Sequence, residues 1–153
     1  MTTPFDERHG WWLYQHPAFR EVFDRLVRDV ARIRAGDPNA AAAHPKAKLL
    51  KRIAELILDE IPRDPSAPEY RQGTTLGPEY RHWRRAKFLG RFRLFFRYSS
   101  KQRVIIYAWL NDENTLRKSG SKSDPYQVFA RRLQRGDPPD DWGSLMNEAR
   151  SDG

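Results

Sequence analysis

The chain has 153 residues, 39% of them hydrophobic and 31% charged, with a net charge of +8. This composition is that of a folded protein and not of an intrinsically disordered one, and the length suits one domain over residues 1–153. It contains no cysteine, which excludes disulfide frameworks, zinc–thiolate sites and thiol chemistry and fits a reducing compartment. No apolar run reaches the roughly 20 residues of a membrane span, and the N-terminus has no signal-peptide pattern, so we expect a cytoplasmic protein without a membrane partner.

The first part of the chain predicts one strand and two helices. Residues 10–14 are rich in aromatic side chains and read as a short strand. From Pro17 the apolar residues recur at three-and-four spacing, which predicts an amphipathic helix that Gly36 ends. A second helix with the same spacing begins near Pro45 and ends at Pro62.

Three closely spaced strands are predicted after an irregular connection rich in proline and glycine. They cover Trp83–Leu89, Arg91–Ser99 and Arg103–Leu110. The joins between them are short, a single glycine at the first and three residues at the second. We therefore expect these strands to form antiparallel hairpins.

The last part of the chain predicts helices again. Asp124 is suited to the N-cap and Pro125 to the first turn of a helix that Gly136 closes, and a short helix follows around Trp142. The order β-α-α-β-β-β-α predicts an α+β domain with its helices on one face of an antiparallel sheet. The other face of that sheet then needs an explanation.

The excess positive charge is concentrated in one stretch of the sequence. Residues 80–122 contain twelve lysines and arginines but two acids, a net charge of +10, whereas the rest of the chain carries −2. Such a concentration is typical of a protein that binds an acidic partner such as nucleic acid. A solvated basic face or a dock for an acidic protein remains the alternative.

Side-chain alternation along the strands sorts this charge onto one face. Opposite the expected core face lie basic and aromatic side chains, namely Arg85, Lys87, Arg91, Arg93 and Arg97 with Trp83, Phe95, Tyr107 and Trp109. Guanidinium groups bind phosphates and aromatic rings stack on bases, so the face is suited to single-stranded RNA. In the alternative reading, the arginines pair with nearby acids and the rings cover the edge of the core.

The chemistry open to this face is limited by what the sequence lacks. The four histidines are scattered without metal-ligand spacing, and the basic stretch holds too few acids for a two-metal nuclease. RNA carries its own nucleophile, the 2′-hydroxyl, and its cleavage needs proton transfer and cations near the phosphate. Arginine and lysine supply the cations, and Tyr126 is a candidate for proton transfer. No cofactor is expected.

Several segments of the chain together match the pattern of one known family. They are Gly10-Trp11, Leu13-Tyr14 and His16-Pro17; Trp83, Arg85 and Lys87-Phe88; Gly90 to Tyr98; Trp109 to Arg117; and Asp124, Tyr126, Val128-Phe129, Gly136 and Pro138 to Trp142. With these segments the chain resembles the YhaV toxins of bacterial type II toxin–antitoxin systems, within the RelE/ParE superfamily. The resemblance runs almost from end to end, and the stretch through Arg117 is specific.

This resemblance implies a RelE-like fold and an endoribonuclease toxin that cleaves mRNA without a metal, either free or on the ribosome, and so inhibits translation and growth. It implies neutralisation by a PrlF-type antitoxin with an AbrB-like part, in a complex that binds its own operator DNA. The implied catalytic residues are Arg85, Lys87, Arg93, Arg117 and Tyr126. The implied RNA contacts are Trp83, Arg91, Arg97, Trp109 and Lys122.

Two other functions fit the same basic face. One is a non-enzymatic toxin on the same fold, as in gyrase-poisoning ParE-type members, which grips protein or DNA. The other is a nucleic-acid-binding module without activity. The concentration of phosphate-binding side chains at the predicted sheet centre favours RNA cleavage over both.

Overall fold

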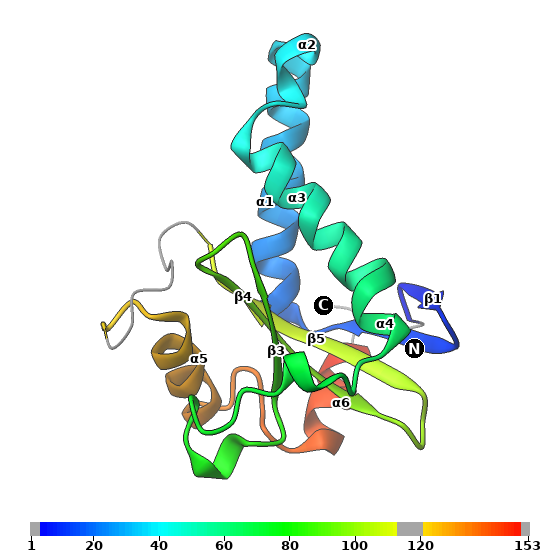
Figure 1. The fold of residues 1–153 in the computed structure, drawn as a ribbon, viewed down its shortest axis with the longest axis vertical. Coiled ribbons are helices and arrows are strands. Elements are labelled where there is room, and N and C mark those ends of the chain that lie inside the picture. The colour runs from blue at the N-terminus through cyan, green and yellow to red at the C-terminus, as the bar shows by residue number, and fades with distance from the viewer. Residues whose placement is uncertain (1–3, 113–120, 151–153) are drawn as a thin grey trace.

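The computed structural model describes residues 4–112 and 121–150, which form an α+β architecture around a five-stranded sheet (Figure 1). The strands are β1 (Asp6–Arg8), β2 (Trp11–Gln15), β3 (Arg84–Phe88), β4 (Phe92–Ser99) and β5 (Val104–Leu110), in the order β1-β2-β5-β4-β3. The strands β2 and β5 are parallel, and the other pairs are antiparallel. The α+β class is therefore confirmed, but the sheet is mixed because helices connect β2 to the later strands. A RelE-like fold stays a prediction.

The helical elements are α1 (Pro17–Gly36), α2 (Pro38–Ala41), α3 (Pro45–Glu55), the π-helical turn η1 (Leu56–Glu60), α4 (Ile61–Arg63), the 3-10 turns η2 (Pro68–Tyr70) and η3 (Pro78–Tyr80), α5 (Pro125–Gln134) and α6 (Trp142–Arg150). The helices α1, α3 and α5 begin at the residues that the sequence predicts, Pro17, Pro45 and Pro125, whereas the short helical turns between them were not predicted. Together α1, α2 and α3 form an arm that projects beyond the sheet (Figure 1). A helix with the length and apolarity needed to span a bilayer is not found among the described residues.

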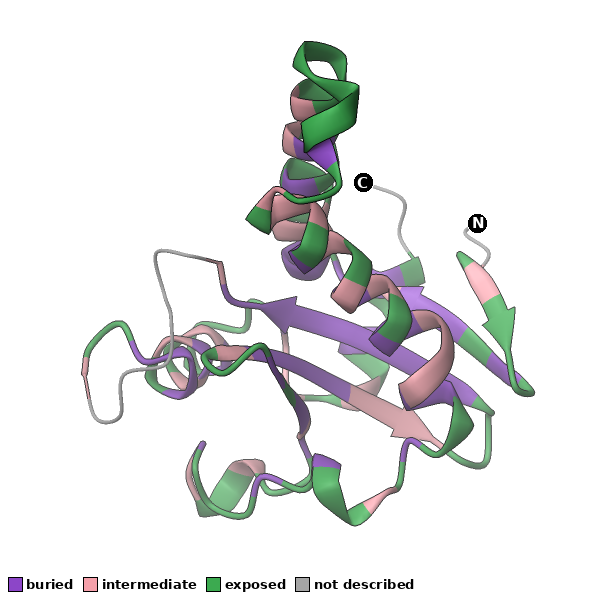
Figure 2. Ribbon diagram, turned by 45° about the horizontal axis from the view of Figure 1, so that its top comes forward, coloured by how far each residue is buried: buried purple, intermediate pink, exposed green. Residues whose placement is uncertain are grey.

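Helices cover both faces of the sheet, so the expectation of one open face is wrong. On one face α1, α3 and η1 pack against the strands, in a cluster that includes Phe19, Ile53, Leu94 and Phe96. On the other face α5 and α6 pack in a second cluster, which includes Phe129, Leu145, Phe95 and Ile106. The strands β4 and β5 accordingly run through the most buried part of the molecule (Figure 2). The alternation pattern left the position of α5 and α6 undetermined, because it identifies the two faces but not what covers them.

A β-bulge between β4 and β5 changes which side chains share a face. Phe95 pairs with Trp109 and Phe96 with Tyr107, so Ala108 is an extra residue on β5. As a result Tyr107 lies beneath α1 and α3, whereas Trp109 lies on the α5 side. The predicted facing of β5 is wrong over Val104–Ala108 and right at Trp109 and Leu110. Every residue of β5 is buried, so its sequence shows no alternation that would reveal the bulge.

The buried hydroxyl of Tyr107 compensates for a proline inside the second helical segment. In the π-helical register of η1, the N–H of Ile61 donates to the carbonyl of Leu56, and the next carbonyl, that of Ile57, would accept from residue 62. Pro62 has no N–H, and the Tyr107 hydroxyl donates to the Ile57 carbonyl at 2.7 Å instead. Burial raises the pKa of Tyr107 well above its ordinary value, which keeps this hydroxyl a donor.

His16 joins the start of α1 to the C-terminal helix α6. Its Nδ1 accepts a hydrogen bond from the N–H of Ala18 at 3.0 Å, which caps α1, and its Nε2 lies 2.7 Å from Glu148 Oε1. An Nδ1 that accepts and an Nε2 that donates describe the neutral imidazole. The residue is almost completely buried, and burial is the main cause that lowers the pKa of His16 below its usual value.

We expect the free energy of unfolding to decrease as the pH is lowered, because of His16. Below about pH 6.5 the unfolded chain binds a proton at this residue while the folded chain, with its lower pKa, does not, so the stability present above that pH is lost as the pH falls toward the folded-state pKa. His16→Asn keeps a capping acceptor but cannot titrate. Urea unfolding on both sides of about pH 6.5 should therefore show a smaller pH dependence for His16→Asn than for the wild type. The exposed residue His82 provides the control variant, His82→Asn. An equal pH dependence of the free energy of unfolding in His16→Asn and the wild type would contradict this interpretation.

Candidate active site

The hydroxyl of Tyr126 brings two predicted site arginines together. It accepts a hydrogen bond from Arg85 Nε at 2.8 Å and from Arg93 Nε at 3.1 Å. Tyr126 lies in the first turn of α5, where Asp124 caps the helix by accepting from the Tyr126 N–H at 3.1 Å. Strands β3 and β4 supply the arginines, and α5 supplies the oxygen between them. Arg85, Arg93 and Tyr126 are hereafter called the arginine–tyrosine cluster.

Backbone carbonyls fix the orientation of both guanidinium groups. Arg93 Nη1 donates to the carbonyls of Gly90 at 2.9 Å and Phe92 at 2.8 Å, and Arg85 Nη1 donates to the carbonyl of Glu69 at 2.7 Å. These bonds leave the Nε and Nη2 edge of each group toward the Tyr126 hydroxyl. Among the described residues neither Nη2 has a hydrogen-bond partner, so each remains available to an incoming acceptor.

A buried asparagine that the sequence analysis did not single out holds the backbone of this site. Asn111 Oδ1 accepts from the N–H of Arg93 at 2.7 Å, and its Nδ2 donates to the carbonyl of Arg91 at 3.1 Å. The side chain thereby continues the pairing of β5 with β4 past the end of the strand. Its signal in the sequence is an amide residue directly after an uninterrupted apolar strand.

The charges of the cluster have no carboxylate partner in the described part of the chain. Arg85 and Arg93 are 9% and 7% exposed, and neither forms an ion pair with a described acid. Lys87 lies directly opposite Arg93 in the β3–β4 register and is exposed, so it adds a third positive charge. Buried arginines are normally paired, and like charges on facing strand positions repel. The arrangement is therefore suited to binding an anion.

The aromatic residues predicted to stack on bases are buried instead. Trp83 is fully buried, with its ring edge-on to Phe129 at 5.1 Å and its Nε1 donating to Asp140 Oδ1 at 2.7 Å. Trp109 is 5% exposed and stacks on Phe129 at 5.7 Å. Because α5 covers these rings, neither is open to a nucleobase in this structure. The prediction that they contact RNA thus loses its geometric basis.

Arg97 is also engaged within the protein. Its guanidinium lies 5.4 Å from the ring centroids of both Trp83 and Trp142, and its Nη1 donates to the Asp140 carbonyl at 2.5 Å. Burial lowers the pKa of Arg97. Asp140 Oδ1 also lies 2.6 Å from His82 Nε2. These contacts tie the segment between α5 and α6 to the sheet, so Arg97 has a structural role that the sequence did not reveal.

The other predicted site residues are more peripheral. Arg91 and Lys122 are exposed, as an RNA contact requires, and Arg117 lies outside the described residues. No group of three histidine, aspartate or glutamate side chains that could hold a metal ion occurs among residues 4–112 and 121–150.

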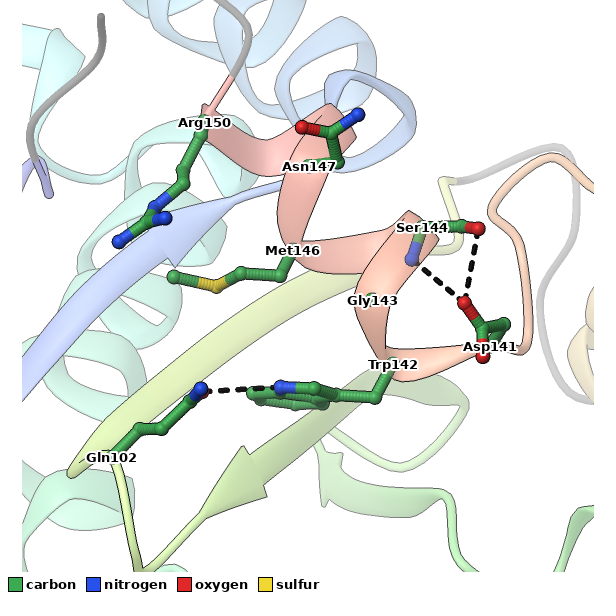
Figure 3. Close-up of a pocket in the computed structure, with 8 residues that line it drawn as sticks. All are labelled: Gln102, Asp141, Trp142, Gly143, Ser144, Met146, Asn147 and Arg150. Atoms are coloured by element: carbon green, nitrogen blue, oxygen red, sulfur yellow. Dashed lines mark hydrogen bonds between the residues drawn. The ribbon is translucent and has the colours of Figure 1, made fainter.

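A hollow of about 430 Å³ along α6 is less suited to an anion (Figure 3). Its lining contains one cationic side chain, Arg150, at the far end from Trp142. Its carboxylate, Asp141, accepts from the backbone and hydroxyl of Ser144 at 2.9 and 3.0 Å, and Gln102 accepts from the Trp142 indole. The arginine–tyrosine cluster is therefore the better candidate site.

We expect inorganic phosphate to stabilise the folded protein through the arginine–tyrosine cluster. A ligand that binds only the folded state at about 100 times its Kd adds about 2.7 kcal/mol to the free energy of unfolding. The increment should shrink in Arg85→Gln and persist in Arg84→Gln, since the guanidinium of Arg84 lies near the Tyr98 ring and donates to the Arg81 carbonyl. The increment is measured by urea unfolding in phosphate and, for comparison, in chloride at the same ionic strength. An equal increment in the wild type and Arg85→Gln would exclude this site.

Comparison with known proteins agrees with the family resemblance. A family model described as a toxin with endonuclease activity, of a toxin–antitoxin system, matches residues 13–150. Toxin YhaV of Escherichia coli O6:H1 (strain CFT073) is 47% identical over 142 residues, which cover 92% of each chain. Ribonuclease toxin YhaV of Escherichia coli (strain K12) is 46% identical over 142 residues, with the same coverage. The chain therefore belongs to the YhaV family of toxins of toxin–antitoxin systems.

Proposed function

We propose that this toxin is an endoribonuclease that cleaves mRNA at the arginine–tyrosine cluster without a metal ion. The observation that carries the proposal is the pair of buried guanidinium groups that converge on one hydroxyl and lack a carboxylate partner among the described residues. A phosphate diester is an anion of the right kind for two such groups. The endonuclease description of the family and the printed name of the K12 relative support RNA as the substrate.

In the proposed reaction the 2′-hydroxyl attacks the adjacent phosphorus. A bond forms between O2′ and phosphorus, the bond from phosphorus to O5′ breaks, and the products are a 2′,3′-cyclic phosphate and a 5′-hydroxyl. The proton of the 2′-hydroxyl leaves to a base, and the departing O5′ gains a proton. Arg85 and Arg93 would hold the phosphate oxygens through their Nη2 atoms, with Lys87 as a third cation. The Tyr126 hydroxyl, placed between the guanidinium groups, would transfer a proton.

Membership of a toxin–antitoxin system implies an antitoxin as a partner. We propose that it is of the PrlF type and that it neutralises the toxin by covering Lys87 and the arginine–tyrosine cluster with an acidic segment. Exposed Lys87 and Arg91 give that segment charges to bind. Binding of operator DNA by the complex, action on the ribosome and a cationic role for Arg117 and Lys122 are parts of the same proposal.

Arg93→Lys should abolish most RNA cleavage while the protein stays folded. Lysine keeps the charge but cannot donate at once to Tyr126, the Gly90 and Phe92 carbonyls and a phosphate. The loss of such a contact in the transition state costs about 2–4 kcal/mol, a hundredfold or more in rate. Arg97→Lys on the same strand is the control, since its contacts lie away from the cluster. Cleavage rates with matched unfolding curves test the prediction, and a folded Arg93→Lys protein with wild-type activity would refute it.

Cleavage should continue in excess EDTA and should require the 2′-hydroxyl. An RNA with a 2′-O-methyl group at the scissile position lacks the nucleophile and should resist. The purified protein is incubated with both RNAs, with and without translating ribosomes, and the 3′ ends are identified. Binding without cleavage under every condition would favour one of the two non-enzymatic functions. Activity that needs Mg²⁺, or a product with a 3′-hydroxyl, would contradict the mechanism.

A further inference from the structure

A second hollow adjoins the arginine–tyrosine cluster at the edge of the sheet. It has a volume of about 430 Å³ and lies beside the edge strand β3, between η1 and the turn η2. Its lining includes Arg52, Glu60, Tyr70, Arg71, Arg85 and Lys87. A volume of this size falls in the range of pockets that bind small organic groups.

Two residues belong both to this hollow and to the proposed phosphate site. Arg85 donates through Nε to Tyr126 and through Nη1 to the Glu69 carbonyl, so one guanidinium joins α5 to η2. Lys87 lines the hollow and lies opposite Arg93 in the strand register. A phosphate held at the cluster would therefore have one of its neighbouring nucleotides beside the hollow.

The side chains around the hollow offer hydrogen bonds that the protein itself does not use. Tyr70 is 6% exposed, its ring is edge-on to Phe96 at 5.4 Å, and its hydroxyl has no hydrogen-bond partner among the described residues. Burial, followed by the charges of Glu69, Glu60 and Asp64, raises the pKa of Tyr70 to about 12, so the hydroxyl remains a donor at neutral pH.

Some charged side chains around the hollow are paired with each other, and one is not. Glu60 and Arg52 form a bidentate ion pair, in which each charge neutralises the other. The exposed guanidinium of Arg71 has no hydrogen bond or ion pair in the described part of the chain. A nucleobase presents donors and acceptors on a flat apolar ring, which matches a wall that combines an aromatic hydroxyl, a free guanidinium and aliphatic carbons.

We propose that this hollow is a nucleotide subsite in which Tyr70 and Arg71 contact the base next to the scissile phosphate and give the enzyme a sequence preference. The inference rests on the proposed ribonuclease function and adds to it the origin of base selection. Because Arg85 is shared, the subsite also sets the position of the phosphate relative to the arginine–tyrosine cluster.

The chain provides its own matched control for this proposal. The tetrapeptide Pro-Glu-Tyr-Arg occurs twice, at 68–71 and at 78–81, and both copies begin with a 3-10 turn. The first copy lines the hollow and the second does not. A triple substitution at the first copy (Glu69→Gln, Tyr70→Phe, Arg71→Gln) leaves unchanged the backbone carbonyl that holds Arg85. The same triple substitution at the second copy (Glu79→Gln, Tyr80→Phe, Arg81→Gln) makes the identical chemical change elsewhere.

The first experiment maps cleavage positions on a long RNA for the wild type and both variants, by sequencing the new 5′-hydroxyl ends. The wild type and the second-copy variant should share one base preference beside the cut. The first-copy variant should still cut, but with that preference weakened roughly tenfold, since each lost hydrogen bond contributes about a factor of three to ten. Unchanged preference in the first-copy variant, or equal changes in both variants, would overturn the proposal.

A second measurement separates this proposal from the proposed catalytic function, because it needs no cleavage. Thermal stabilisation by the four nucleoside 3′-monophosphates is compared with that by inorganic phosphate at equal concentration. In the wild type and the second-copy variant at least one nucleotide should bind roughly tenfold more tightly than phosphate, an advantage that the first-copy variant should lose. If no nucleotide binds better than phosphate in the wild type, the subsite is refuted even where RNA is cleaved. If nucleotides bind as expected but no RNA is cleaved, the subsite stands and the catalytic proposal fails.

Discussion

The docking of α5 on the second face of the sheet builds one of the two core clusters and assembles the candidate site. The ring of Phe129 stacks on Phe95 at 4.3 Å and on Trp109 at 5.7 Å, contacts that bury the centre of β4 and β5. Aromatic contacts of this kind contribute about 0.5–1.5 kcal/mol each beyond the area they bury. The same docking carries Tyr126, one helical turn earlier, to Arg85 and Arg93. Without α5 the two guanidinium groups would face water, and the cluster would not form.

The cluster is an unusual use of buried charge, and this makes an anion its natural partner. Burying a guanidinium costs several kcal/mol unless hydrogen bonds and an opposite charge compensate. Carbonyls and the Tyr126 hydroxyl supply hydrogen bonds to Arg85 and Arg93, but the opposite charge is missing from the described residues. A bound phosphate diester would supply it. Donors fixed in advance by carbonyls lose little orientational freedom when that anion arrives, which is how preorganised sites stabilise developing charge.

The sequence predicted the main helices, the strands and the candidate residues better than it predicted which elements pack around them. The helices begin at Pro17, Pro45 and Pro125, as their caps and apolar spacing indicate, and the basic strand residues do meet Tyr126. The burial of the second face was not predictable, because alternation on β3 and β4 separates two faces without telling what covers each. On β5 the alternation itself fails, since an all-apolar strand hides the extra residue Ala108. Both failures concern how one element meets another, which the residue pattern within a single element does not encode.

Because helices cover both faces of the sheet, a substrate chain can approach the cluster from few directions. Strand β5 and residues 93–96 of β4 are enclosed between the two helical layers, so the edge strand β3 is where the cluster comes nearest to solvent. There Lys87 is exposed, and Arg85 reaches across the edge to the Glu69 carbonyl. A ligand entering at this edge meets the turn η2 and the arginine–tyrosine cluster together. Phosphate binding and base contact would then act through one shared guanidinium, so a change on η2 would be felt at the reacting phosphate through the position of Arg85.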